Sequence, residues 1–289
     1  MSYILTDLLK NDTLKYLGTP VEAPELGYLN HLIRAYTCKV PWESVSRIVK
    51  RHTTSAPVDC PRWPEEFWHD AIRYGFGGTC FESSLAFFAL LSSLGYDGYL
   101  TVNDMGTTRA CHAAIVLLLN GRKYLVDITI PVHGAVEIDP QKSTTKSTDF
   151  HDYTLVPTGV DIYQVERSHH PQRYAFTLID RPVDLGDYQA IVEKDYTDTG
   201  FFLRGVVMVK VIENKVWRFF SDHKPYRMES FNKEGRTEMN LSPERLAVSL
   251  AQQFQMPEDK ISAALLWIHH PIGQTRRPGL PVPGRVRCR

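Results

Sequence analysis

Residues 75–95 have the sequence GFGGTCFESSLAFFALLSSLG, in which a glycine-rich turn leads into a long apolar segment with a cysteine at the junction. The apolar run predicts a helix that starts at Cys80, with Gly95 well placed as its C-terminal cap. The N-terminus of a helix offers unpaired N–H groups and the positive end of the helix dipole, and both favour a thiolate over a thiol. Cys80 is therefore a candidate nucleophile, although a buried, inert cysteine is the commoner case.

Two glycines precede this cysteine. Gly77 and Gly78 allow backbone conformations that a side chain would forbid, and they let a ligand approach closely. The pair is not a phosphate-binding loop, because no Gly-Lys-Ser/Thr follows it.

The composition is that of an ordinary soluble globular protein. Its 289 residues are 43% hydrophobic and 23% charged, and the formal net charge is zero with scattered basic residues. These values are sufficient for a hydrophobic core, and they give no sign of a basic patch that would bind nucleic acid. Without a signal-peptide core or a run of 18 apolar residues, we expect no membrane segment and a reducing, cytoplasmic setting.

Cysteine and histidine patterns give no metal or disulfide signal. The five cysteines are irregularly spaced without a CxxC motif, which indicates neither a zinc ribbon nor a disulfide framework. The pairs His169-His170 and His269-His270 lack the spacing of metal ligands, so no metal site is expected.

The first 95 residues are expected to be mostly helical. Apolar spacing predicts one or two short helices in 2–17 and further helices at 25–38 and 65–74. Between them lie a short apolar segment, 45–49, and a proline-rich loop, 52–64.

The pattern then becomes β-like and indicates a small antiparallel barrel or sandwich. The β-like runs are 99–102, 112–119, 122–130, 153–156, 173–178, 205–211 and 215–220. Helices are expected within 180–196, from Ser242 as N-cap to 254, and over 259–268. The tail 271–289, rich in Pro, Gly and Arg, should be irregular.

The clearest hairpin signal is Asn120-Gly121, the preferred sequence of a type I′ turn. If these are the two loop residues, Asp127 lies opposite Ala114. His112 is two residues from Ala114 and points to the same face of the sheet. His112 and Asp127 then become diagonal neighbours within reach of a hydrogen bond, and a slip of one residue would separate them.

This arrangement suits a catalytic triad. Cys80 would supply the sulfur, His112 would take its proton, and Asp127 would fix the tautomer and stabilise the imidazolium. Taken singly, each partner is more often an ordinary strand residue, but the joint arrangement favours the catalytic interpretation. The neighbouring Cys111 faces the other side of the strand and is expected to be structural.

These residues resemble the arylamine N-acetyltransferase family. The run Gly77-Gly78-Thr79-Cys80-Phe81-Glu82, then His112, then Val126-Asp127 match the family's motifs in order and spacing. Upstream, residues 40–44 (Val-Pro-Trp-Glu-Ser) look like its Val-Pro-Phe-Glu-Asn segment.

The resemblance implies an α+β fold with a core like that of cysteine proteases and transglutaminases. It implies an N-terminal helical bundle (1–95) carrying Cys80, a central antiparallel β-barrel (96–204) carrying His112 and Asp127, and a C-terminal α/β lid (205–289). It also implies ping-pong transfer of an acetyl or other short acyl group through a thioester on Cys80. The co-substrate would be an acyl-CoA, the acceptor a small aromatic amine or hydrazine, and no cofactor would be permanently bound.

The family also implies substrate-binding residues. Trp42, Gly78, Thr79 and Ile130 match its acceptor site, and Ile130 stands where a Phe often lines the amine pocket. Thr199, Gly200 and Phe201 are candidate contacts of CoA.

The chain departs from the family pattern around the nucleophile. Phe76 occupies the place of an Arg that usually pairs with the Glu matching Glu43. Glu43 therefore needs another partner, for which we expect Arg73. Ser44 and Ser84 replace two Asn residues. The acyl donor and the amine preference stay open.

Two other functions remain alternatives. A transglutaminase-like or papain-like thiol enzyme acting on peptide amides has the same Cys–His–Asp order, although the segment at 40–44 favours the acyltransferase. A degenerate family member that binds CoA without turnover would explain the altered positions 44, 76, 84 and 130.

Overall fold

The N-terminal helices pack around one central helix. The computed structural model describes residues 4–130, 132–168, 172–197 and 200–269. Its first helices are α1 (Asp7–Leu17), α2 (Leu26–Lys39), α3 (Val45–Thr53), α4 (Pro64–Tyr74) and α5 (Cys80–Ser93). Helix α5 is apolar on nearly all sides and lies in the core, as expected of a helix without a polar face. Gly95, at φ 89°, follows its end as predicted.

One detail of this region differs from the sequence prediction. Residues 45–53 form α3 rather than a short apolar segment. The sequence pattern did not predict this helix, because its buried face has only two large apolar residues, Val45 and Ile48. Residues 4–17 contain one helix, which agrees with the prediction of one or two. The expected loop at 52–64 contains a single 3-10 turn, Pro57–Asp59.

The middle of the chain forms an eight-stranded antiparallel sheet in the order β5-β4-β3-β2-β9-β8-β7-β6. The outer strands β5 and β6 also lie together, and the Thr144 hydroxyl donates to the Glu137 carbonyl, so the sheet is a nearly closed barrel. Its strands are β2 (Asp97–Met105), β3 (Thr108–Leu119), β4 (Arg122–Val126), β5 (Val136–Ile138), β6 (Thr144–Ser147), β7 (Asp152–Gly159), β8 (Ile162–Arg167) and β9 (Tyr174–Ile179).

The β3–β4 hairpin has the predicted register. Asn120 and Gly121 have φ values of 51° and 74°, as a type I′ turn requires. Leu119 pairs with Arg122 and Ile115 with Val126, which sets Asp127 beside Ala114.

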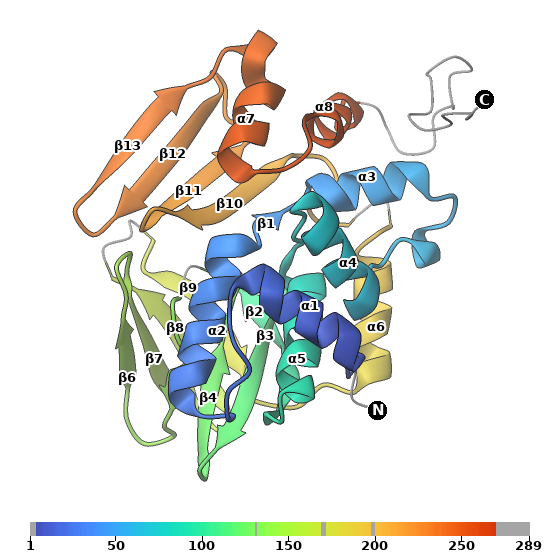
Figure 1. Cartoon of the computed structure of the whole chain (residues 1–289). Helices are drawn as coiled ribbons and strands as arrows, with labels where there is room; N and C mark the ends of the chain where they lie inside the picture. Colours follow the sequence, from blue (N-terminus) through green and yellow to red (C-terminus); the bar gives the residue numbers. More distant parts are fainter. Residues whose placement is uncertain (1–3, 131, 169–171, 198–199, 270–289) are drawn as a thin grey trace.

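The C-terminal part is a second antiparallel sheet with helices on one face (Figure 1). Strand β1 (Trp42–Glu43), from the N-terminal half, joins its edge beside β10. The elements are β10 (Val207–Ile212), β11 (Lys215–Phe220), β12 (Arg227–Asn232), β13 (Gly235–Asn240), α7 (Leu246–Phe254) and α8 (Glu258–Trp267). Ser242 occupies the N-cap position of a short 3-10 turn, Pro243–Arg245, without a side-chain capping bond. The helix α7 starts only at Leu246, so the expected continuous helix from Ser242 is wrong in this detail.

The α+β class with helices, barrel and C-terminal α/β part is confirmed, whereas the boundaries at 95/96 and 204/205 stay predictions. Helix α6 (Leu185–Lys194) follows the barrel strands in the chain but packs on the α5 core through Tyr188 and Val192. The Tyr188 hydroxyl donates to the Phe81 carbonyl at 2.7 Å. Within the described ranges, no helix has the length and apolar character needed to cross a membrane.

Candidate active site

Cys80 is the first residue of α5 and is 6% exposed. The turn before it runs beside β1, where Trp42 bridges to Gly78 and the Glu43 N–H donates to the Gly78 carbonyl at 3.2 Å. A Cβ on Gly77 would lie 1.7 Å from the Pro41 carbonyl oxygen. Neither Gly77 nor Gly78 has a positive φ. The glycines are therefore needed for close packing, not for the unusual backbone conformation that the sequence suggested.

The Cys80 thiol faces strand β3. Its Sγ donates to the Cys111 carbonyl at 3.7 Å, and one turn along α5 the Ser84 hydroxyl donates to the Ala113 carbonyl at 3.1 Å. These two contacts lie on either side of His112 in the chain. They fix the start of α5 against the strand that carries the histidine, and they give Ser84 a structural role.

His112 and Asp127 form the hydrogen bond that the hairpin register predicts. The Nε2 of His112 is 2.7 Å from Oδ2 of Asp127, and both side chains are buried. The other carboxylate oxygen, Oδ1, accepts from the N–H and hydroxyl of Thr129 at 2.9 and 2.7 Å. The Phe176 ring packs against the imidazole with 4.4 Å between ring centroids. With Nε2 bound to Asp127, Nδ1 is the nitrogen left for the proton of Cys80.

The charges of this pair support each other. Burial opposes the charge on His112, but the Asp127 carboxylate and the Cys80 side chain outweigh burial and raise the pKa of His112 to about 10. Burial likewise opposes the charge on Asp127, but His112 and Thr129 outweigh it and lower the Asp127 pKa. The histidine is therefore an imidazolium at neutral pH, next to the Cys80 side chain.

A buried arginine that the sequence did not reveal holds the turn before the nucleophile. The Nη2 of Arg62 donates to the Gly77 carbonyl at 2.6 Å and to Oε2 of Glu82 at 3.0 Å. Its backbone N–H donates to Oε1 of Glu82 at 2.9 Å. Arg62 and Glu82 are each almost fully buried. Phe76, at the family's arginine position, packs instead in the core below the C-terminal sheet.

The expected pairing of Glu43 with Arg73 is wrong. Arg73 is exposed and lies over the Tyr74 ring. Glu43 is fully buried and accepts from the Ser46 N–H at 2.9 Å and the Gly77 N–H at 3.1 Å. Burial raises the pKa of Glu43, partly offset by the charge of Arg62. No pattern around Arg62 marked it, because its two shortest side-chain hydrogen bonds go to Gly77 and Glu82, which are 15 and 20 positions away.

A second buried arginine ties the segment after α6 to the turn. The Nη1 of Arg47 donates to the Thr79 hydroxyl at 3.4 Å, and its Nε donates to the Phe201 carbonyl at 3.1 Å. Arg47 also pairs with the Asp195 carboxylate at 2.7 Å. Of the candidate CoA contacts, Phe201 is thus linked through Arg47 to Thr79, and Gly200 is its neighbour in the chain; Thr199 lies outside the described residues.

Trp42 and Ile130 line one small hollow, together with residues of α2 and β10. The Trp42 ring packs edge-on against Phe202, with centroids 5.1 Å apart. Its buried Nε1 has no hydrogen-bond partner among the described residues, so a donor is available there. Ser44, which replaces a family Asn, bonds to the Gly205 carbonyl (2.9 Å) and the Val207 N–H (3.0 Å) and so holds β1 to the C-terminal sheet.

The described part of the chain contains no group of three or more His, Cys, Asp or Glu side chains suited to a metal ion. His169, His170 and His270 lie outside that part.

Comparison with known families identifies one match, which covers most of the chain. The model of the N-acetyltransferase family matches residues 25–259. No protein of curated function matches the sequence.

Solved structures with the same fold are arylamine N-acetyltransferases. That of Mycobacterium abscessus has a TM-score of 0.74 at 18% identity, covering 90% of this chain and 94% of its own. That of Mycobacterium marinum, in complex with CoA, has a TM-score of 0.74 at 15% identity and covers 88% of this chain and 97% of its own. The NAT3 enzyme of Bacillus cereus, with a Cys-His-Glu catalytic triad, has a TM-score of 0.71 at 15% identity, with coverages of 87% and 99%.

Proposed function

Because the chain belongs to the arylamine N-acetyltransferase family, we propose that it transfers an acetyl or other short acyl group from an acyl-CoA to an arylamine, arylhydrazine or similar amine. The proposed route is ping-pong, through a thioester on Cys80, with His112 and Asp127 as the other catalytic residues. The observation that carries the proposal is the buried 2.7 Å bond between His112 and Asp127 beside the Cys80 thiol.

In the first half-reaction, the Cys80 thiolate attacks the thioester carbonyl of the acyl-CoA. The negative charge that develops on the carbonyl oxygen would be stabilised by the free N–H groups at the start of α5. The C–S bond to CoA then breaks, and the leaving thiolate takes the proton of the His112 imidazolium. The products are acyl-Cys80, free CoA and a neutral His112.

In the second half-reaction, the amine attacks the acyl-Cys80 carbonyl. Neutral His112 accepts the proton that the amine loses, and Asp127 stabilises the imidazolium that results. Asp127 stays ionised, since its pKa is lowered and both of its oxygens accept hydrogen bonds. Collapse of the intermediate releases the amide and restores the thiolate–imidazolium pair.

We assign acceptor binding to Trp42, Gly78, Thr79 and Ile130. Trp42 and Ile130 share a hollow beside β10, and Gly78 and Thr79 directly precede the nucleophile. The unpartnered Nε1 of Trp42 can donate to a polar atom of the acceptor, which the Phe of the family motif cannot do.

We assign CoA binding to residues Thr199, Gly200 and Phe201. Support comes from the link between Phe201 and Thr79 through Arg47, and from the similar fold of the Mycobacterium marinum enzyme that binds CoA. We also propose a role in xenobiotic metabolism and a reducing, cytoplasmic setting, and the four free thiols within the described ranges fit that setting.

Intact mass after incubation with acetyl-CoA tests the proposal. We expect a single acetyl adduct that is absent in Cys80→Ala and is discharged by an added arylamine with formation of the N-acetyl product. Cys111→Ala is the matched control and should keep the adduct. Cleavage of peptide amides without an adduct would instead indicate a thiol hydrolase, and CoA binding without an adduct would indicate a catalytically degenerate homologue.

A further inference from the structure

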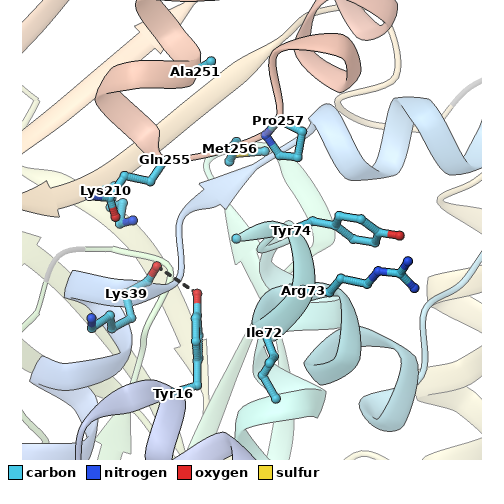
Figure 2. Close-up of a pocket in the computed structure, with 11 residues that line it drawn as sticks. Tyr16, Lys39, Ile72, Arg73, Tyr74, Lys210, Ala251, Gln255, Met256 and Pro257 are labelled. Atoms are coloured by element: carbon cyan, nitrogen blue, oxygen red, sulfur yellow. Dashed lines mark hydrogen bonds between the residues drawn. The ribbon is translucent and has the colours of Figure 1, made fainter.

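A hollow of about 440 Å³ lies between the N-terminal helices and the C-terminal sheet and helices. Figure 2 shows Tyr16, Lys39 and Ile72 below it and Gln255, Met256 and Pro257 above it. None of the proposed catalytic or substrate-binding residues lines it. Its size is within the range of small-molecule sites in proteins.

The charged side chains around this hollow are all basic. Lys39, Arg73 and Lys210 line it, and none of the described lining residues is Asp or Glu. Apolar surface comes from Ile72 and Met256. A site of this kind suits a ligand with one anionic end and an apolar body.

Lys210 is the most informative of the three cations. Its side chain is 6% exposed, and the hydrogen bond described for its ammonium group goes to the Phe254 carbonyl at 3.3 Å. The described residues place no carboxylate in an ion pair with Lys210, and an ammonium group has three N–H donors, of which the bond to Phe254 uses one. A buried charge without a counter-charge is costly, and an anionic ligand would remove that cost.

Lys210 lines both this hollow and the hollow of Trp42 and Ile130, but its ammonium group lies on the side of α7, where it donates to the Phe254 carbonyl. Along β10, Val209 and Val211 face the core next to Phe150, whereas Met208 lies in the core under α7 and α8. Lys210 shares the face of Met208 because side chains alternate along a strand. Burial, and then the charge of Lys39, lowers the pKa of Lys210 to about 8, with Cys38 acting in the opposite direction. Lys210 is still mostly protonated at neutral pH.

The carbonyl ends of four helices also meet at this hollow, and they oppose an anion. Tyr16, Lys39, Tyr74 and Ala251 lie in or near the last turns of α1, α2, α4 and α7. Each helix end carries roughly half a negative charge, and its effect fades within one turn. Three of these end carbonyls already accept hydrogen bonds. The Gly75 N–H donates to the Ala71 carbonyl, the Tyr16 hydroxyl to the Lys39 carbonyl at 3.4 Å, and the Lys210 ammonium group to the Phe254 carbonyl. Lys39 and Lys210 supply positive charge against what remains, whereas the Arg73 side chain extends away from the hollow beside Tyr74 (Figure 2).

We propose that this hollow is a binding site for a small organic carboxylate, whose charged end pairs with Lys210 and whose apolar body packs on Ile72 and Met256. Lys210 is the one lining residue that this hollow shares with the hollow of Trp42 and Ile130, and occupancy of the proposed site does not depend on Cys80.

Benzoate is a suitable probe, with benzamide as its neutral counterpart. Both are titrated by calorimetry into protein whose Cys80 has been alkylated, so that the acceptor site is blocked. We expect benzoate to bind at one site and benzamide to bind on the order of tenfold more weakly, since its neutral amide cannot form the ion pair with Lys210. Lys210→Met should weaken benzoate binding to the same extent. Lys215 is an exposed lysine on the next strand, and Lys215→Met should leave benzoate binding unchanged.

A second measurement covers the case in which Lys210→Met does not fold. In protein labelled at its methionine methyl groups, benzoate should shift the resonance of Met256, assigned by Met256→Leu, at the same concentrations at which heat is observed. Equal binding of benzoate and benzamide, unchanged binding in Lys210→Met, or an unmoved Met256 resonance each overturns the proposal.

Discussion

The buried pair of Arg62 and Glu82 should be a main support of the nucleophile's turn, and Arg62→Met tests this. Both side chains are about 1% exposed, 3.0 Å apart, and Arg62 also binds the Gly77 carbonyl at 2.6 Å. Removing the cation leaves a carboxylate buried without its partner, which typically costs about 3–5 kcal/mol. We expect a loss of that size in the free energy of unfolding, measured by urea denaturation at pH 7.

Two further variants sharpen this test. Arg73→Met removes the exposed cation that the sequence alone suggested, and it should change stability by less than about 0.5 kcal/mol. Arg62→Met combined with Glu82→Gln should be more stable than Arg62→Met alone, because the carboxylate at position 82 is no longer buried without its cation. A loss under about 1 kcal/mol in Arg62→Met, as for an exposed ion pair, would refute the reasoning.

Three other predictions follow from the same geometry. Asp127→Asn should lower turnover by about a hundredfold or more while the protein stays folded; full activity would exclude Asp127 from the triad. Because folding raises the pKa of His112, the protonated histidine stabilises the folded protein. This stabilisation is complete below pH 6.5, the pKa of the unfolded state, and is lost as the pH rises through about 10. The stability advantage over Asp127→Asn should thus shrink between about pH 7 and pH 10, and a constant advantage in urea melts would contradict the pair. Gly77→Ala should unfold the protein or cost several kcal/mol, since a Cβ would meet Pro41, whereas Gly27→Ala, in open space within α2, should be neutral or stabilising in thermal melts.

Local signals in the sequence predicted much of the site. Asn120-Gly121 fixes the hairpin register by turn geometry alone, and that register places His112 and Asp127 on one face. The helix at Cys80 follows from an apolar run with a glycine after it. Both predictions depend only on neighbours in the chain.

Features that depend on distant contacts were missed. Arg62 is buried by Gly77 and Glu82, and no local pattern marks such a pairing. Strand β1 is two residues long and exists because it pairs with β10, more than 160 residues later. Strand β13 is exposed along its whole length and has no alternation of apolar residues. Tertiary pairing decides these elements, and it is not encoded in the spacing of nearby residues.

The rate at which iodoacetamide alkylates Cys80 at about pH 6 tests the triad most directly, because a free thiol is almost wholly protonated there. The buried His112 imidazolium beside the thiol predicts fast alkylation of the native protein. It also predicts slow alkylation of His112→Gln. Both rates are measured from the mass of the Cys80 adduct over time. Slow alkylation of the native protein, or equal rates in the two proteins, would contradict the thiolate–imidazolium pair on which the proposed acyl transfer depends.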